Sequence, residues 1–127
     1  MVPNALKRVG ELLDVLAQIS DVERQVVVQG RNPYSFVPND LLEDWYQAYE
    51  GRRSLQSPDV SDDVIAVLAD FGYQLDQIVD ILPDSADDKE AYIRNNEVWR
   101  AIRELADWTL TRITVLTVPE TPEFGPN

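Results

Sequence analysis

The sequence contains no histidine and no cysteine, and these absences restrict the chemistry of its side chains. Without histidine the chain cannot build a Ser-His-Asp or Cys-His arrangement, because both use an imidazole as the base. Without cysteine it has no disulfide, no thiol nucleophile and no cysteine-type zinc site. Paired carboxylates are the remaining acid–base option, but the acids fall on outward faces of the predicted helices, whereas catalytic carboxylates need burial or close like charges. We therefore predict that the protein is not an enzyme.

Sequence signals for cofactor binding, membrane insertion and secretion are also lacking. The five glycines are scattered, so no glycine-rich phosphate loop is present. No apolar run approaches the roughly 20 residues that a membrane helix needs. The N-terminal Met1–Asn4 segment lacks the basic and then apolar pattern of a signal peptide. We expect a soluble, cytoplasmic protein with no cofactor, no bound metal and no membrane partner.

What the sequence does have is a large excess of negative charge. Its 127 residues include 23 Asp and Glu against 11 Lys and Arg, which gives a net charge of −12. With 44% hydrophobic residues, the chain has the composition of a globular protein rather than of a disordered acidic tail. Such a charge repels nucleic acid and anionic membranes, and it attracts basic proteins. Solubility alone is the alternative interpretation of the same charge.

The spacing of apolar residues predicts an all-α, single-domain helical bundle of four main helices plus one or two short helices. We expect the domain to occupy residues 1–118, and an extended or mobile tail to occupy residues 119–127. Leu6, Val9, Leu13 and Leu16 form the expected apolar row of the first helix, with Leu12 and Ile19 beside them. The four main helices are predicted over Pro3–Ile19, from Asn39 or Asp40 to Glu50, over Ser61–Leu82, and from Asn95 or Asn96 to about Ile113.

Two segments leave helix and strand open as alternatives. Residues 21–29 follow a good N-cap at Asp21, but the run Val26–Val28 is β-branched and therefore also suits a strand. The segment 113–118 is likewise β-branched and apolar. A short helix ending at Arg94 is predicted after the acidic connection that begins at Asp84.

The helix after Ser61 is the clearest element. Asp62 and Asp63 occupy its first turn, where the helix dipole favours anions. Its outward carboxylates fall on two edges, with Asp62, Asp76 and Asp80 on one edge and Asp63 and Asp70 on the other. Its core row consists of Val64, Leu68, Phe71, Leu75, Ile78 and Leu82. Gly72 lies beside this row and predicts a close helix crossing; a kink lining a groove is the alternative.

Aromatic residues cluster between the second and fourth helical segments. The loop with Tyr34, Phe36 and Val37 is unusually apolar, so we expect it to pack onto the body of the protein. Tyr46 is the aromatic residue expected at the surface, beside carboxylates that can steer a partner. The candidate partner-binding residues are therefore Glu43, Asp44, Tyr46, Glu50, Asp62, Asp63, Asp70, Asp76 and Asp80.

The acids Asp84, Asp87, Asp88 and Glu90 form a loose cluster of oxygen ligands. A calcium loop of the EF-hand type needs ligands at alternating positions and a central glycine, and this segment has neither. We interpret the cluster as a solvated acidic linker that also caps a helix.

The order of some core and turn residues resembles a group of small acidic bacterial proteins similar to the immunity proteins of toxin–immunity systems. The likeness begins with Phe36-Val37-Pro38 and Leu41 to Trp45, and continues with Tyr49-Glu50-Gly51. It then includes Val67 to Phe71, Leu82-Pro83, and Trp99 to Ile102. It covers roughly residues 36–113 and carries no functional residue over. The resemblance implies an immunity-type inhibitor of a toxin domain.

Composition and pattern together predict an acidic protein-binding module whose partner is a basic protein, such as a toxin domain. Two alternatives remain. One is a small structural protein that forms a homodimer or larger homo-oligomer through the apolar heptad row of the helix after Ser61. The other is a nucleic-acid mimic that blocks a DNA-binding protein, which predicts carboxylates spaced like phosphates along one face.

Overall fold

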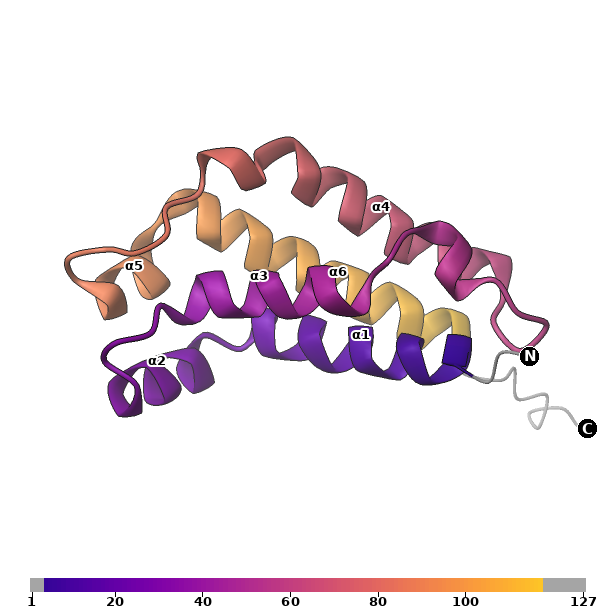
Figure 1. Ribbon diagram of the computed structural model, residues 1–127, viewed down its shortest axis with the longest axis horizontal. Coiled ribbons are helices and arrows are strands. Elements are labelled where there is room, and N and C mark those ends of the chain that lie inside the picture. The colour runs from indigo at the N-terminus through magenta and orange to yellow at the C-terminus, as the bar shows by residue number, and fades with distance from the viewer. Residues whose placement is uncertain (1–3, 118–127) are drawn as a thin grey trace, which may run out of the picture.

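A computed structural model of the chain describes residues 4–117, and every regular element in that range is helical (Figure 1). The protein is an all-α single domain with six α-helices in that range, where four main helices plus one or two short helices were predicted. The α-helices are α1 (Asn4–Ser20), α2 (Val22–Arg31), α3 (Val37–Ala48), α4 (Asp62–Ile78), α5 (Lys89–Asn95) and α6 (Glu97–Thr117), and the 3-10 helices are η1 (Arg52–Leu55) and η2 (Val79–Ile81). The predicted tail, residues 119–127, lies outside the described residues.

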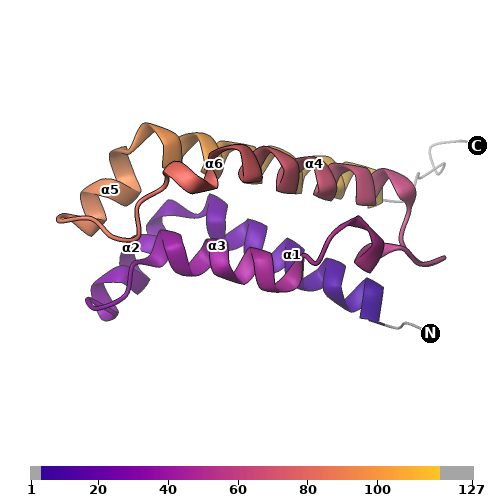
Figure 2. The ribbon, with the colours of Figure 1, turned by 45° about the horizontal axis from the view of Figure 1, so that its top comes forward.

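The four long helices, α1, α3, α4 and α6, run side by side along the long axis (Figures 1 and 2). α1 packs against α3 and α6, and α4 packs against α6. The shorter α2 and α5 pack against each other at one end of the bundle. None of the helices in residues 4–117 combines the length and the apolar character needed to cross a membrane.

The first helix is confirmed, but its buried row differs from the predicted one. Leu6 was expected in the core and is 56% exposed, whereas Ala5 and Leu12 are almost fully buried. Leu13 is only partly buried. Val9 and Leu16 of the predicted row are buried, and so are Leu12 and Ile19 beside it, because α1 contacts both α3 and α6 and therefore buries a broad face.

The segment 21–29 is helix rather than strand. Asp21 caps it as predicted, by accepting a hydrogen bond from the backbone N–H of Arg24 at 3.0 Å. The side chains that α2 buries are Gln25 and Gln29, not its valines. Gln25 receives a hydrogen bond from the indole N–H of Trp99 at 2.9 Å, so the buried amide binds α2 to α6.

The loop before α3 packs onto the body only in part. Phe36 and Val37 are buried as expected, but Tyr34 is fully exposed. Helix α3 begins at Val37, earlier than the predicted Asn39 or Asp40, because Pro38 suits the first turn of a helix. It ends at Ala48, before the predicted Glu50.

The predicted N-caps of α4 and α6 are confirmed, but α4 ends at Ile78, before the predicted Leu82, and η2 follows it. Ser61 Oγ accepts a hydrogen bond from the backbone N–H of Val64 at 3.2 Å at the start of α4, and Asn96 Oδ1 accepts one from that of Trp99 at 2.9 Å at the start of α6. The β-branched end of α6 remains helical through Thr117, so the alternative of a strand is wrong for residues 113–117. Residue 118 lies outside the described residues.

Candidate functional site

A hydrogen bond between two neighbouring long helices lies at the centre of the candidate site. The hydroxyl of Tyr46 on α3 donates to Asp76 Oδ1 on α4 over 2.6 Å. Asp80, one turn beyond Asp76, is near enough for its charge to act on the same hydroxyl. At this hydrogen bond the structure thus brings Tyr46 close to two other predicted partner-binding residues, Asp76 and Asp80, which lie 30 and 34 positions later in the sequence.

Aromatic packing beneath this hydrogen bond joins α3 to α4. The buried ring of Trp45 contacts Phe71 edge-on, with ring centroids 4.7 Å apart, and stacks on Tyr49 at 5.2 Å. Gly72 makes room for this cluster, because a Cβ added there would lie 3.0 Å from Tyr49 Cε2. Gly72 was predicted at a close helix crossing, but the groups that approach it are the side chains of Tyr49 and Trp45, at the end of α3, rather than the backbone of another helix.

The side chains around the hydrogen bond are exposed, so the site is a surface and not a cavity. Tyr46 is 37% exposed, and Tyr73, one turn before Asp76 on the same helix, is 64% exposed. Glu43 lies one turn before Tyr46 on α3 and is also exposed. We call this surface the acidic seam and define it as Glu43, Tyr46, Tyr73, Asp76 and Asp80.

Burial of the Tyr46 ring is the largest effect that raises the pKa of its hydroxyl above its ordinary value of 10.0. The hydrogen bond to Asp76 and the charges of Asp76 and Asp80 raise this pKa further. Burial also raises the pKa of the neighbouring Tyr49, while the charge of Arg52 opposes that shift. At neutral pH Tyr46 is therefore a protonated hydrogen-bond donor whose ring and carboxylate partner are held in one arrangement.

The other predicted partner-binding residues lie elsewhere. Asp44 faces a hollow of about 150 Å³ between α1, α2 and α3, which Asp40 and Arg24 also line. Glu50 forms an ion pair with Arg8 of α1 at 3.6 Å. Asp70 accepts a hydrogen bond from the side chain of Gln74 at 2.7 Å.

Asp62 and Asp63 are exposed in the first turn of α4, at the opposite end of that helix from Asp76. The rise of about 1.5 Å per residue separates them from Asp76 by roughly 20 Å. A single partner that contacted both these two acids and the acidic seam would therefore have to span roughly 20 Å.

Most of the net charge belongs to the segment that contains the acidic seam. Residues 32–88 hold 13 Asp and Glu but only two Arg, so their net charge is −11 out of −12 for the chain. Three ion pairs form within residues 4–117, and Glu50 is the only acid of this segment that takes part in one. The carboxylates of the acidic seam therefore have no cation beside them within the described chain.

Two of the acids after Pro83 have structural roles. Asp88 Oδ1 accepts a hydrogen bond from the backbone N–H of Ala91 at 2.9 Å and so caps α5, as predicted for this linker. Glu90 forms an ion pair with Arg94 at 3.0 Å. No group of three or more acidic side chains within residues 4–117 is placed to hold a metal ion.

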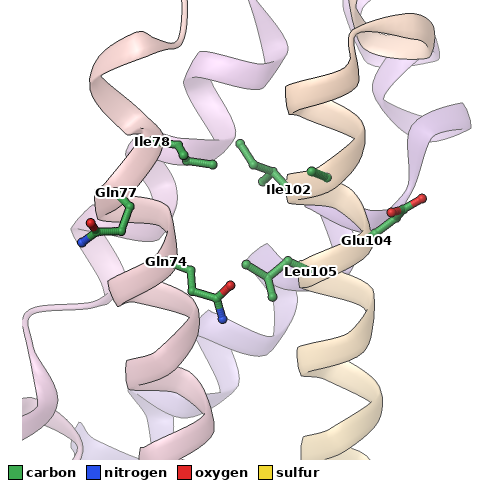
Figure 3. Close-up of a pocket in the computed structure, with 7 residues that line it drawn as sticks. Gln74, Gln77, Ile78, Ile102, Glu104 and Leu105 are labelled. Atoms are coloured by element: carbon green, nitrogen blue, oxygen red, sulfur yellow. The ribbon is translucent and has the colours of Figure 1, made fainter.

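A second surface feature lies on the opposite edge of α4. A groove of about 530 Å³ runs between α4 and α6, and Ile78 and Ile102 point towards each other across it (Figure 3). Residues two apart in an α-helix differ by about 200° in direction, so Asp76 points away from the edge where Gln74 and Ile78 line the groove. The acidic seam and the groove are therefore separate surfaces.

Tyr73 is the member of the acidic seam that the sequence analysis did not identify. The signal was present, because Tyr73 lies outside the apolar heptad row of α4 and next to the edge that carries Asp76 and Asp80.

A comparison with protein-family models, with curated proteins and with solved structures finds no match for this chain.

Proposed function

We propose that the protein is an acidic binding module that recognises a basic protein through the acidic seam. The observation that carries the proposal is the hydrogen bond between Tyr46 and Asp76, at the centre of a surface whose carboxylates lack ion-pair partners within the described chain. Unpaired acids raise the rate at which a basic partner is encountered, and they gain favourable contacts only when it binds.

Tyr46 and Tyr73 are the proposed anchors of the interface. A tyrosine offers a large contact area at a low cost in side-chain entropy, which is why tyrosines are enriched among the residues that dominate binding. The hydrogen bond to Asp76 holds Tyr46 in place before a partner arrives. Tyr73 exposes 64% of its surface beside the same carboxylate.

The proposed partner is a basic toxin domain, and the protein would act as its immunity-type inhibitor. This choice rests on the resemblance over residues 36–113, a range that contains the whole acidic seam. Enzymes that act on nucleic acid present cationic surfaces to phosphates, and an acidic protein competes for such surfaces. The proposal places binding rather than catalysis at the seam, because its carboxylates are exposed.

The two alternatives receive less support from the same coordinates. Along α4 the acids 62, 63, 70, 76 and 80 are unevenly spaced and divide between two edges, whereas a nucleic-acid mimic needs one even row. In the homo-oligomer alternative, the apolar heptad row of α4 pairs with a second copy. That row is largely buried within one copy, since Val64, Leu68, Phe71 and Leu75 are buried. A homo-oligomer would have to use another surface.

A pair of variants with the same loss of charge tests the proposal. The purified protein is immobilised at low salt and exposed to lysate of the source cell, and the retained proteins are identified by mass spectrometry. We expect basic proteins to be retained by the wild type and by Glu11→Gln/Asp14→Asn on α1, but not by Asp76→Asn/Asp80→Asn. If both double variants retain equally little basic protein, net charge alone accounts for the binding. If Asp76→Asn/Asp80→Asn retains as much basic protein as the wild type, the acidic seam has no role in it.

A further inference from the structure

Helix α6 carries a second apolar row in addition to the one that it buries in the core. Trp99, Ile102, Ala106 and Ile113 form the buried row. The second row begins with Ala101 and Leu105, which line the groove between α4 and α6. It continues at steps of three and seven with Trp108 and Val115, which are 54% and 61% exposed. A solvent-exposed row with heptad-like spacing is the pattern of a helix that packs against another helix.

The groove beside this row has the shape and lining that a helix requires. Its walls come from two neighbouring helices, with Ile78 on α4 and with Ile102 and Leu105 on α6 (Figure 3). Gln74 and Gln77 on α4 supply polar groups at its edge. A third helix can lie between two packed helices when its apolar side chains fill such a depression.

Charges on α6 point to a second copy of the chain as the occupant. Glu104 and Arg112 lie four residues before and four residues after Trp108, and both are exposed. Neither forms an ion pair within residues 4–117. A two-fold axis at Trp108 with antiparallel α6 helices would place Glu104 opposite Arg112 of the second copy, and the symmetry would form this pair twice.

The same arrangement also matches the apolar positions. Val115 lies seven residues after Trp108 and Ala101 lies seven before it, so Val115 of the second copy would reach the part of the groove that Ala101 and Leu105 line. We propose that two copies of the chain pair through this surface, with Trp108 on the two-fold axis, Glu104–Arg112 pairs on either side, and Val115 in the groove of the other copy.

Electrostatics favour this face over the acidic seam for self-association. Within residues 4–31 and 89–117, which include α6, the nine Lys and Arg almost balance the eight Asp and Glu. Two copies that met through residues 32–88 would instead bring together segments of net charge −11 each. The inferred dimer leaves both acidic seams on the opposite edges of the α4 helices, so it does not depend on the proposed function.

Sedimentation velocity on the full chain, from about 10 µM to about 1 mM, tests the pairing directly. We expect the wild type to be a reversible dimer in this range. Trp108→Ala should raise the dissociation constant by at least about tenfold, because it removes the central aromatic contact. Glu104→Arg and Arg112→Glu should each weaken the dimer, because each places like charges opposite each other. The double variant Glu104→Arg/Arg112→Glu should restore it.

Tyr73→Ala is the matched control, because Tyr73 is an exposed aromatic residue on the other edge of α4 and should leave the dissociation constant unchanged. Circular dichroism checks that every variant keeps its helical content. A wild-type monomer over the whole range would overturn the proposal. A dimer that survives Trp108→Ala, or a double charge variant that is no tighter than its parents, would overturn it equally.

Discussion

The acidic segment, residues 32–88, and the two nearly neutral segments, residues 4–31 and 89–117, contribute to one core but are held together by different interactions. In the neutral segments buried polar groups are hydrogen-bonded across helices: Gln25 accepts from Trp99 and donates to the backbone carbonyl of Ile19 at 2.6 Å. In the acidic segment Trp45, Tyr49 and Phe71 join α3 to α4 through ring contacts.

The difference shows how a small domain can concentrate charge of one sign. Apolar and aromatic contacts are indifferent to the net charge of the surface above them, so the core of the acidic segment needs no compensating cations. The basic side chains are therefore used elsewhere: Arg94 pairs with Glu23 and Glu90, and Lys89 donates to two carbonyls of the loop before α3. The carboxylates of the acidic seam form no ion pair within the described chain.

Replacing each buried tryptophan by phenylalanine should separate the two kinds of core most clearly. Both indoles are fully buried, but Trp99 Nε1 donates to Gln25, whereas Trp45 Nε1 has no hydrogen-bond partner within the described chain. Trp99→Phe leaves Gln25 Oε1 buried and unpaired, so we expect it to lower the free energy of unfolding by about 1–3 kcal/mol more than Trp45→Phe does. Urea denaturation measures both values, and equal losses would contradict the distinction.

Two glycine replacements should differ by about 1 kcal/mol for a steric reason. A Cβ at Gly10 of α1 would meet no atom within 4 Å, so Gly10→Ala should stabilise the protein by about 0.5–1 kcal/mol through helix propensity. A Cβ at Gly72 of α4 would lie 3.0 Å from Tyr49 Cε2, so Gly72→Ala should lose most or all of that gain. Thermal unfolding compares the two variants. Equal stabilisation would mean that the side chains of Tyr49 and Trp45 move to accept the new Cβ without a loss of stability.

Tyr46→Phe should change stability by about 0.5–1 kcal/mol at neutral pH, since the hydrogen bond to Asp76 is partly exposed and therefore screened. The larger effect is in the pH dependence. The pKa of Tyr46 is raised in the folded state, so its contribution is complete below the unfolded-state value of 10.0 and is lost as pH rises beyond it. We expect the wild type to lose stability above pH 10 more steeply than Tyr46→Phe does. Parallel curves of unfolding free energy against pH for the two proteins would contradict a raised pKa of Tyr46.

The smallest expected effect comes from reversing one charge in each segment. Asp80→Lys should raise the free energy of unfolding by about 0.2–0.5 kcal/mol, because a repulsive pair with Asp76 one turn earlier becomes attractive. Asp107→Lys on α6 should lower it by a similar amount, because the new lysine follows Arg103 by one turn. Both changes should shrink in about 1 M salt. Shifts of the same sign would show that net charge, rather than local charge, sets stability.

The helices could be predicted from the sequence wherever a cap and a periodic apolar row agree. Ser61 and Asn96 cap their helices as expected, and residues 21–29 became ambiguous only because Val26–Val28 suits a strand equally well. The errors, such as the exposure of Leu6 and of Tyr34, concern faces and loops whose burial depends on neighbouring elements. Periodicity shows that a helix has a buried face but does not show how wide that face is.

The candidate site was predictable in kind but not in position. Exposed carboxylates beside Tyr46 were expected, and all nine candidate residues are exposed, including Glu50, which pairs with Arg8. The structure placed only Glu43, Tyr46, Asp76 and Asp80 on one surface and added Tyr73. The contact between Tyr46 and Asp76 spans two helices, and their relative register depends on how Tyr49 packs against Gly72.

By itself the sequence determined the charge of this protein, the chemistry excluded by the lack of histidine and cysteine, and the local capping of its helices. Each of these follows from residue identity or from interactions over a few positions of the chain. Only the tertiary structure decided that the acidic seam and the α4–α6 groove lie on opposite edges of one helix, and that Gln25 is buried against Trp99. Those arrangements depend on side-chain packing between helices that are distant in the sequence.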